Sequence, residues 1–173
     1  DQQHGRPRME NVNQLTEKDV TEILSQREEL LEGYHQRLEM LSREYEDADE
    51  LIGMLQMRSP GVENEIQASG VNKGLDDIYL MYERQRKKYQ EEIHQNMLQI
   101  MDLIDRVKHV YLYYLQLPPK EQAILKEIYI EKKQYKEIIK EGMSESSINR
   151  IRKRAIKIII QRWEKDNREE QEE

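Results

Sequence analysis

Cysteine is absent from the sequence, which excludes disulfide bonds and thiolate metal sites and is typical of a reducing compartment. Phenylalanine is also absent and tryptophan occurs once, so few bulky side chains are available to fill a large globular core. Long apolar runs are missing as well: the longest near the C-terminal end, residues 158–160, is far too short to cross a bilayer. We therefore expect a cytoplasmic protein without membrane contact.

Only four prolines and seven glycines occur in 173 residues, and these are the residues that most often interrupt helices. Charged residues make up 36% of the chain, the same share as the hydrophobic ones, and the mean hydropathy is −1.01. This balance suits long helices that bury one stripe and expose the rest to water. The composition therefore predicts an all-α fold.

The net charge of −7 is unevenly distributed along the chain. Residues 117–165 contain 13 Lys and Arg against 7 Asp and Glu, whereas the rest of the chain contains 15 against 28. A basic segment attracts the phosphate backbone of nucleic acid, and an acidic segment repels it. Double-stranded DNA is therefore the partner expected for the basic segment.

Residues 1–15 are expected to form a disordered lead, of which 1–8, ahead of the first Met, is interpreted as a remnant outside the fold. Thr16 is a suitable N-cap for a first long helix that ends near Met57. Apolar residues recur along this helix at alternating steps of four and three, interrupted only at Arg27. The heptad spacing predicts a coiled coil. Its stripe consists of Val20, Leu24, Leu31, Tyr34, Leu38, Leu41, Tyr45, Ala48, Ile52 and Leu55.

A second long helix is expected from about Leu75 to Gln116, after a loop over 58–74 that contains three of the glycines. Two helices of matched length can fold back on each other, so residues 16–116 are interpreted as a long antiparallel helical hairpin. Parallel self-association of either helix is the rival arrangement, and the sequence does not decide between them. The stripe of the second helix consists of Ile78, Tyr79, Tyr82, Tyr89, Ile93, Met97, Ile100, Ile104, Val107, Tyr111 and Tyr114, widened by Leu103 and Val110.

The stretch Leu117-Pro118-Pro119 is expected to end the second helix after Gln116, because the residue before each proline is pushed out of the helical region. Three shorter helices are predicted next, over about 119–130, 133–141 and 144–165. An acidic disordered tail, 166–173, is expected after them. Residues 117–165 are thus predicted to form a three-helix domain at the C-terminal end.

Residues 134–154 within this domain fit a helix-turn-helix. Tyr135, Ile138 and Ile139 give the first of the two helices an inner face. Gly142 supplies the turn, where a positive φ is needed, and Ser144 is a good N-cap for the next helix. Met143 is expected to pack under the turn. The inward positions of the second helix are predicted to be Ile148, Ile151, Ala155 and Ile158.

The outer face of this second helix is the predicted DNA-binding surface, because the N-terminal residues of a recognition helix reach base edges in the major groove. Asn reads adenine and Arg reads guanine through paired hydrogen bonds. The predicted base-contacting residues are Ser146, Asn149, Arg150 and Lys153. The predicted phosphate-contacting residues are Ser144, Arg152, Arg154 and Lys157.

The stretch 117–160, LPPKEQAILKEIYIEKKQYKEIIKEGMSESSINRIRKRAIKIII, resembles region four of bacterial sigma factors. The shared features are the opening LPPKEQAIL, a Tyr-x-x-Ile in the second helix, and Gly-Met-Ser-x-x-x-Ile followed by Arg-x-x-Ala-Ile. With a long helical segment ahead of it, the chain is similar to the phage-encoded, sigma-like late transcription regulators of low-GC Gram-positive bacteria. The resemblance implies sequence-specific binding to promoter DNA and contact with RNA polymerase.

No catalytic, cofactor or metal site is predicted, because the sequence has no phosphate-cradling glycine-rich loop and no histidine pair at metal-ligand spacing. Two alternatives to a regulator stay open. A small-terminase-like DNA-packaging subunit would assemble into a ring of many copies, whereas a regulator is expected as a monomer or as a homodimer through the long helices. A coiled-coil adaptor would not bind DNA at all.

Overall fold

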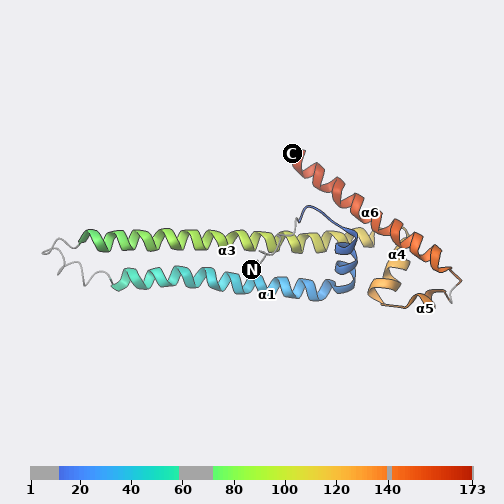
Figure 1. The fold of residues 1–173 in the computed structure, drawn as a ribbon, viewed down its shortest axis with the longest axis horizontal. Helices are drawn as coiled ribbons and strands as arrows, with labels where there is room; N and C mark the ends of the chain where they lie inside the picture. The colour runs from blue at the N-terminus through green and yellow to red at the C-terminus, as the bar shows by residue number, and fades with distance from the viewer. Residues whose placement is uncertain (1–11, 59–71, 140–141, 173) are drawn as a thin grey trace, which may run out of the picture. The chain divides into compact units, whose positions relative to one another are not determined.

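The computed structural model describes residues 12–58, 72–139 and 142–172, without the side chains of 49–58, 72, 73 and 75. No strand occurs in these ranges, so the all-α prediction is confirmed. The chain divides into a first unit, Asp1–Glu32 with Asp102–Glu173, and a second unit, Gly33–Met101, which are described separately. The elements are α1 (Glu17–Arg58), α3 (Asn72–Leu115), α4 (Pro119–Leu125), the π-helical turn η1 (Lys126–Ile130), α5 (Tyr135–Ile139) and α6 (Glu145–Glu172) (Figure 1).

The helix α1 begins where the sequence predicts. The Thr16 hydroxyl accepts a hydrogen bond from the Asp19 backbone N–H (3.2 Å), and the Asp19 carboxylate accepts one from the Thr16 N–H (2.9 Å). These reciprocal bonds satisfy backbone donors at the start of the helix that would otherwise lack partners. Thr16 is therefore the N-cap of α1, as predicted.

The regular geometry of α1 is lost at the point where its heptad pattern is interrupted. Gln26 has non-helical backbone angles (φ −133°, ψ 27°), which kink the helix next to Arg27. The Arg27 guanidinium lies over the ring of Tyr111 from α3, 3.7 Å from its centroid. Because a cation is attracted to the face of an aromatic ring, Arg27 is held by Tyr111 although it interrupts the apolar stripe.

In the second unit, α1 and α3 lie side by side (Figure 1). The Tyr89 hydroxyl donates to the Glu44 carboxylate (2.7 Å), and the Gln90 amide donates to the Tyr45 carbonyl (3.2 Å). These bonds fix which residues of the two helices are neighbours. Among the stripe residues whose side chains the structure describes in this unit, Ile93 and Ile100 are buried.

Several aromatic and aliphatic members of the predicted stripe are exposed in the second unit, so the expectation of a buried heptad seam is wrong for them. Two packed helices bury only the positions that face each other, and a side chain at the edge of the seam stays in contact with solvent. The predicted loop lies mostly outside the described residues, as do the side chains of Ile52 and Leu55. The exposed stripe members are Tyr45, Ile78, Tyr82 and Tyr89.

The lead contributes to the first unit, so the expectation of a disordered segment is wrong for its described part, residues 12–15. Leu15 is buried, and the Asn13 carbonyl accepts a hydrogen bond from the indole N–H of Trp163 in α6 (3.2 Å). The lead is therefore held in place by a buried side chain and by its backbone carbonyls. Residues 1–11 lie outside the described part of the chain.

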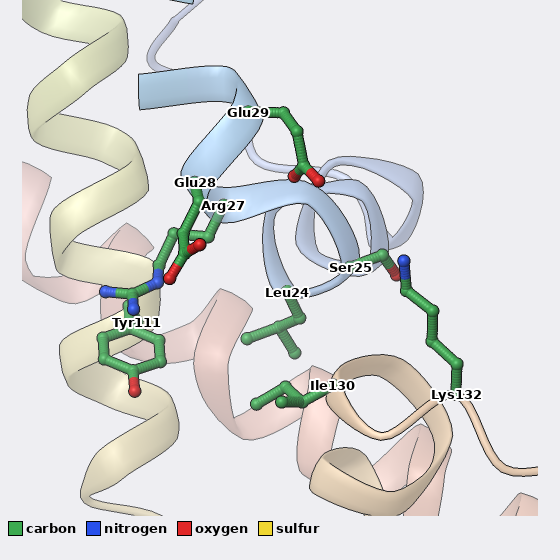
Figure 2. A pocket seen from close by; sticks show the side chains of 8 residues that line it. All are labelled: Leu24, Ser25, Arg27, Glu28, Glu29, Tyr111, Ile130 and Lys132. Carbon is green, nitrogen blue, oxygen red and sulfur yellow. The ribbon is translucent and has the colours of Figure 1, made fainter. Parts of the chain in front are cut away.

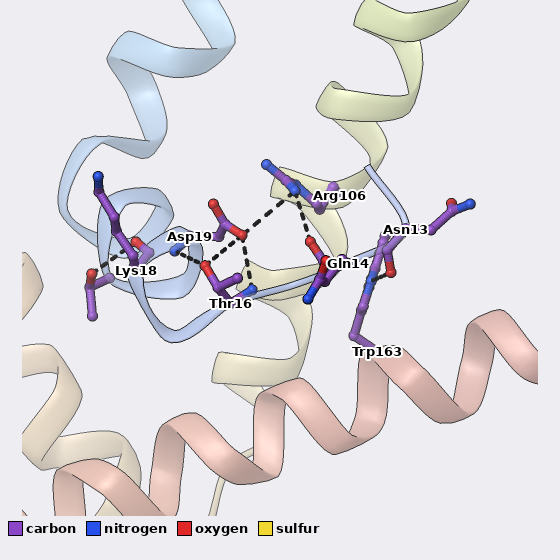
Figure 3. A network of polar contacts seen from close by, with 8 residues as sticks. Asn13, Gln14, Thr16, Lys18, Asp19, Arg106 and Trp163 are labelled. Atoms are coloured by element: carbon purple, nitrogen blue, oxygen red, sulfur yellow. Dashed lines mark hydrogen bonds and ion pairs between the residues drawn. The ribbon is translucent and has the colours of Figure 1, made fainter. Parts of the chain in front are cut away.

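Arg106 of α3 joins the lead to the start of α1 (Figure 3). Its buried guanidinium donates to the Gln14 carbonyl (3.5 Å) and lies 3.9 Å from the Asp19 carboxylate. Burial of a cation is costly unless acceptors or anions lie next to it, and these two contacts offset that cost for Arg106. They hold the lead and the first turn of α1 against α3.

Within the first unit, α3 is buried on two faces. Val107, Val110 and Tyr114 of the predicted stripe are buried, and so is Tyr113, which lies outside that stripe. The Tyr113 hydroxyl donates a hydrogen bond to the Asp166 carboxylate of α6. The second buried face of α3 is thus explained by its contact with α6.

The helix α6 continues to Glu172, whereas the sequence predicts a disordered tail over 166–173. The Asp166 carboxylate in this stretch accepts the hydrogen bond from Tyr113, and an i, i+4 ion pair adds local support. The sequence contains no glycine or proline here that would end the helix. The prediction of a disordered tail is therefore wrong for the described residues.

The Tyr113–Asp166 pair predicts a loss of stability at alkaline pH. Burial, the hydrogen bond to Asp166 and the charge of that carboxylate raise the pKa of Tyr113 above its ordinary value of 10.0. The unfolded chain therefore releases this proton at a lower pH than the folded chain, and the free energy of unfolding falls as the pH rises above that value. Between about pH 8 and about pH 11, the free energy of urea unfolding should fall more for wild type than for Tyr113→Phe. The same pH dependence in both chains would contradict this assignment.

The short helices lie close to their predicted positions. α4 and η1 together cover the predicted helix 119–130, and α5 begins two residues after the start of the predicted helix 133–141. Residues 140 and 141 lie outside the described part of the chain. Between η1 and α5, Lys132 has a φ of 53°, which turns the chain at the end of the π-helical turn.

Candidate nucleic-acid interface

The N-terminal half of α6 is fixed by a small apolar core. Ile148 and Ile151 of α6 are buried in one cluster with Ile124 of α4 and Ile138 of α5. α4 also packs directly against α6. Because one side of α6 is held in this way, the opposite side of the helix is left for solvent or a partner. The residues that pack at the edges of the cluster are Ile128, Tyr135 and Met143.

The turn before α6 is formed as the sequence predicts. Gly142 has a φ of 93°, a conformation that costs a residue with a Cβ more than it costs glycine. The Ser144 hydroxyl accepts a hydrogen bond from the Ser147 backbone N–H (3.2 Å), so Ser144 caps the helix. Met143 lies half-buried against the core cluster. The positions predicted for the turn, the cap and the packing residue are confirmed.

Three of the four predicted base-contacting residues are exposed: Ser146, Arg150 and Lys153. Their spacing of four and three places them in one row along the helix, about half a turn away from Ile148. Lys157 is also exposed and continues the row by one further turn. The structure therefore brings these four residues together on the side of α6 that faces away from its core.

Asn149, the fourth predicted base-contacting residue, differs from the other three. It is half-buried at the edge of the exposed row, and its Oδ1 atom accepts a hydrogen bond from the Tyr135 hydroxyl of α5 (3.0 Å). Asn149 thus lies next to the exposed row, but its amide oxygen already accepts a hydrogen bond from Tyr135. The sequence gives no sign of this bond, which joins two residues from different helices.

Arg152 does not lie on an exposed flank, contrary to the prediction of a phosphate contact. Its side chain is 18% exposed, and its guanidinium donates to the Glu17 carboxylate and to the Tyr129 hydroxyl, each at 3.1 Å. Helical geometry explains the difference, because position 152 lies only about 40° around the helix from the buried Ile148. Arg152 therefore ties α6 to α1 and η1 rather than facing outward.

The contacts of Arg152 stabilise its charged form. Burial alone disfavours the charged guanidinium, but the hydrogen bond with Tyr129 and the charge of Glu17 outweigh it. The pKa of Arg152 is therefore raised above its ordinary value. A cation that is held in this way is a structural link between helices.

The other predicted phosphate contacts remain accessible. The Arg154 side chain is 56% exposed, although its guanidinium lies 3.5 Å from the Glu121 carboxylate of α4. Lys157 is exposed, and Ser144 is exposed while it caps the helix. An anion at this surface would compete with Glu121 for Arg154. Ser144 and Arg154 are thus accessible near the exposed row of α6, and Lys157 is part of it.

A separate cavity of about 260 Å³ lies elsewhere in the first unit, beside the kink of α1 (Figure 2). Its lining includes the stacked pair Arg27 and Tyr111, together with Lys132 from the turn after η1. Two carboxylates, Glu28 and Glu29, lie in the same lining and offset the two cations. The mixed charge favours no particular ligand, so this cavity is not part of the candidate interface.

Among the residues that the structure describes, no group of three His, Cys, Asp or Glu side chains is placed to hold a metal ion. In the same part of the chain, no helix is both long enough and apolar enough to cross a membrane. No family model, no curated protein and no solved structure matches the chain. The function proposed below therefore rests on the residues of α6 and their neighbours.

Proposed function

We propose that this protein is a sequence-specific DNA-binding transcription regulator of phage or mobile-element type, which acts in the cytoplasm. In this proposal α5 and α6 form a helix-turn-helix, and α6 is the recognition helix. The observation that carries it is the exposed row Ser146, Arg150, Lys153 and Lys157, which lies opposite the buried side of the same helix. A recognition helix needs this division, with one side anchored and the other free to enter the major groove.

The charge of this segment supports the proposal. Residues 145–157 contain five Arg and Lys against a single acidic residue, Glu145, in a chain whose net charge is −7. Double-stranded DNA carries one negative charge for about every 1.7 Å of its axis, so a short basic helix face gains from lying along it. The glutamates of α6 other than Glu145 lie in its C-terminal part.

The long helices are proposed to form an antiparallel hairpin that holds a second copy of the chain or RNA polymerase. Exposed apolar side chains on α3, among them Met81 and Tyr82, are available for such a partner. A homodimer would present two recognition helices to two half-sites one helical turn apart, about 34–36 Å. The solution mass distinguishes a dimer from the many-membered ring of a packaging subunit.

The proposal predicts that Arg150→Ala/Lys153→Ala weakens binding to the selected DNA site by roughly 30-fold or more, because each base contact contributes about 1–3 kcal/mol. Genomic fragments retained by the wild-type chain give the site, and fluorescence anisotropy across a salt series gives the affinity. The slope of affinity against salt concentration should also become smaller. The matched control is Arg84→Ala/Lys87→Ala, which removes two exposed cations from α3 in the second unit.

Equal losses in the two double variants would mean that only net charge matters, and this would contradict sequence-specific reading by α6. Absence of DNA binding by the wild-type chain at low salt would instead favour the coiled-coil adaptor. Both variants should keep the far-ultraviolet circular dichroism of the wild type, because all four side chains are exposed.

A further inference from the structure

Tyr135 and Asn149 form a bond between the two helices of the proposed helix-turn-helix. The Tyr135 hydroxyl at the start of α5 donates to Oδ1 of Asn149 in α6 (3.0 Å). The Tyr135 ring is fixed because it packs against the core cluster of Ile124, Ile138 and Ile148. The hydroxyl therefore comes from a rigid support, and it reaches Asn149 at the edge of the exposed row.

This bond limits what the Asn149 amide can offer to DNA. An asparagine side chain has an acceptor oxygen and a donor NH₂ group on the two branches of one planar amide. When Oδ1 is turned toward Tyr135, Nδ2 is turned away from it. Oδ1 keeps a second lone pair, but it points toward Tyr135, so the group turned away from Tyr135 is the donor.

The choice of base depends on this limit. Paired reading of adenine requires the amide oxygen to accept from N6 while the amide nitrogen donates to N7. A donor alone is matched best by bases whose major-groove edge presents acceptors and no donor, which are guanine through N7 and O6 and thymine through O4. Adenine also accepts at N7, but its N6 donor is then left without the amide oxygen as a partner. The Tyr135 bond therefore works against the adenine contact that an unrestrained asparagine would make.

We propose that Tyr135 is a positioning residue that holds the Asn149 amide with its NH₂ group outward, so that α6 selects guanine or thymine rather than adenine at the base facing Asn149. This inference rests on the proposed function and specifies the DNA sequence that the same surface recognises. Tyr135 itself does not contact the base.

Tyr135→Phe tests the proposal because it removes the hydroxyl and keeps the ring that packs on the core. Tyr129→Phe is a matched control: its hydroxyl, also half-buried, bonds Arg152 at a similar distance, and the proposal gives it no part in base choice. Asn149→Ala and the double variant with Tyr135→Phe complete the set. Each full-length chain is used to select binding sites from a random DNA library at one salt concentration, and thermal unfolding confirms that each is folded.

The expected result is a change at a single base position. Wild type and Tyr129→Phe should enrich guanine or thymine there, and Tyr135→Phe should shift toward adenine by roughly fivefold or more. Asn149→Ala should lose the preference at that position, and the double variant should match Asn149→Ala, because Tyr135 acts only through Asn149. A structural role alone would lower affinity for all sequences without this local change.

Three results would overturn the inference. Wild-type enrichment of adenine or cytosine at the position controlled by Asn149 would mean that the amide presents its oxygen. An identical motif for wild type and Tyr135→Phe would mean that the hydroxyl does not position the amide. If the wild-type chain selects no sequence at all, the proposed function fails and the inference fails with it, whereas the first two results remove the inference alone.

Discussion

A fragment of residues 117–173 is expected not to fold on its own, although it contains every helix around the proposed DNA-binding surface. Three buried side chains of α6, Ile156, Ile159 and Trp163, lie beyond the core cluster that α6 shares with α4 and α5. The Trp163 indole bonds the Asn13 carbonyl and lies 6.2 Å from the ring of His109 in α3. These partners are all missing from the fragment.

The size of the effect follows from burial. Each large apolar side chain that loses its cover costs about 1.5–3 kcal/mol, and a domain of ordinary stability has about 5–15 kcal/mol in total. Loss of the cover over Trp163, of the Arg152–Glu17 ion pair and of the Tyr113–Asp166 hydrogen bond therefore removes a large part of the stability that a small fragment could have. Circular dichroism of the fragment should show low helicity and no cooperative urea transition.

The matched control keeps the first unit and removes the second. A chain in which a short Gly-Ser linker joins Glu32 directly to Asp102 retains both parts of the first unit. This chain should unfold cooperatively and should bind the same DNA site as the full-length protein. Cooperative unfolding of the 117–173 fragment with wild-type stability would contradict the division of the chain described here.

The domain boundary predicted at residue 117 rests on local information, whereas the first compact unit also contains residues from both long helices. Two prolines after α3 mark a real break in the helix, and the sequence therefore predicts a new domain from residue 117. The link between Arg152 and Glu17, however, joins residues 135 positions apart, and the link between Trp163 and Asn13 joins residues 150 positions apart. No periodicity or capping pattern in the sequence encodes contacts of that range.

Features that depend on neighbouring residues are predicted well. The caps at Thr16 and Ser144 need only a hydroxyl and a backbone N–H three residues later, and both bonds are present. The positive φ at Gly142 likewise follows from the residue type at a tight turn. Such short-range chemistry leaves few alternatives for the chain, so it is visible in the sequence.

The proposed DNA-binding surface is predicted in part. Helical periodicity is sufficient to place Ser146, Arg150 and Lys153 on the exposed side of α6. It also places Arg152 beside the buried Ile148, but it does not reveal that Asn149 and Arg152 are each bonded to a tyrosine hydroxyl from another helix. Which residues are free to meet a partner is thus decided by tertiary contacts, and the sequence shows only which side of the helix they occupy.

Trp163→Ala is expected to destabilise the protein by about 3–5 kcal/mol, the cost typical of truncating a large buried aromatic side chain. Trp163 is 5% exposed and is the only tryptophan in the chain. The substitution leaves a cavity between α6 and its neighbours and removes the donor for the Asn13 carbonyl. Urea unfolding followed by circular dichroism measures the loss, since the variant has no tryptophan fluorescence. Glu164→Ala, at the exposed next position, is the control and should change stability by less than about 0.5 kcal/mol.

Trp163→Phe separates the hydrogen bond from the packing. It keeps an aromatic ring in the core but cannot donate to Asn13, so part of its cost is the loss of one hydrogen bond, about 0.5–1.5 kcal/mol. Removal of residues 1–13 deletes the acceptor of the same bond and keeps Gln14, the partner of Arg106. Both changes remove the same contact between Trp163 and Asn13. The free energy of unfolding lost in the combined variant should therefore be smaller than the sum of the two separate losses. Strict additivity would mean that the lead and α6 are not coupled through Trp163, and the role assigned to the lead would then be wrong.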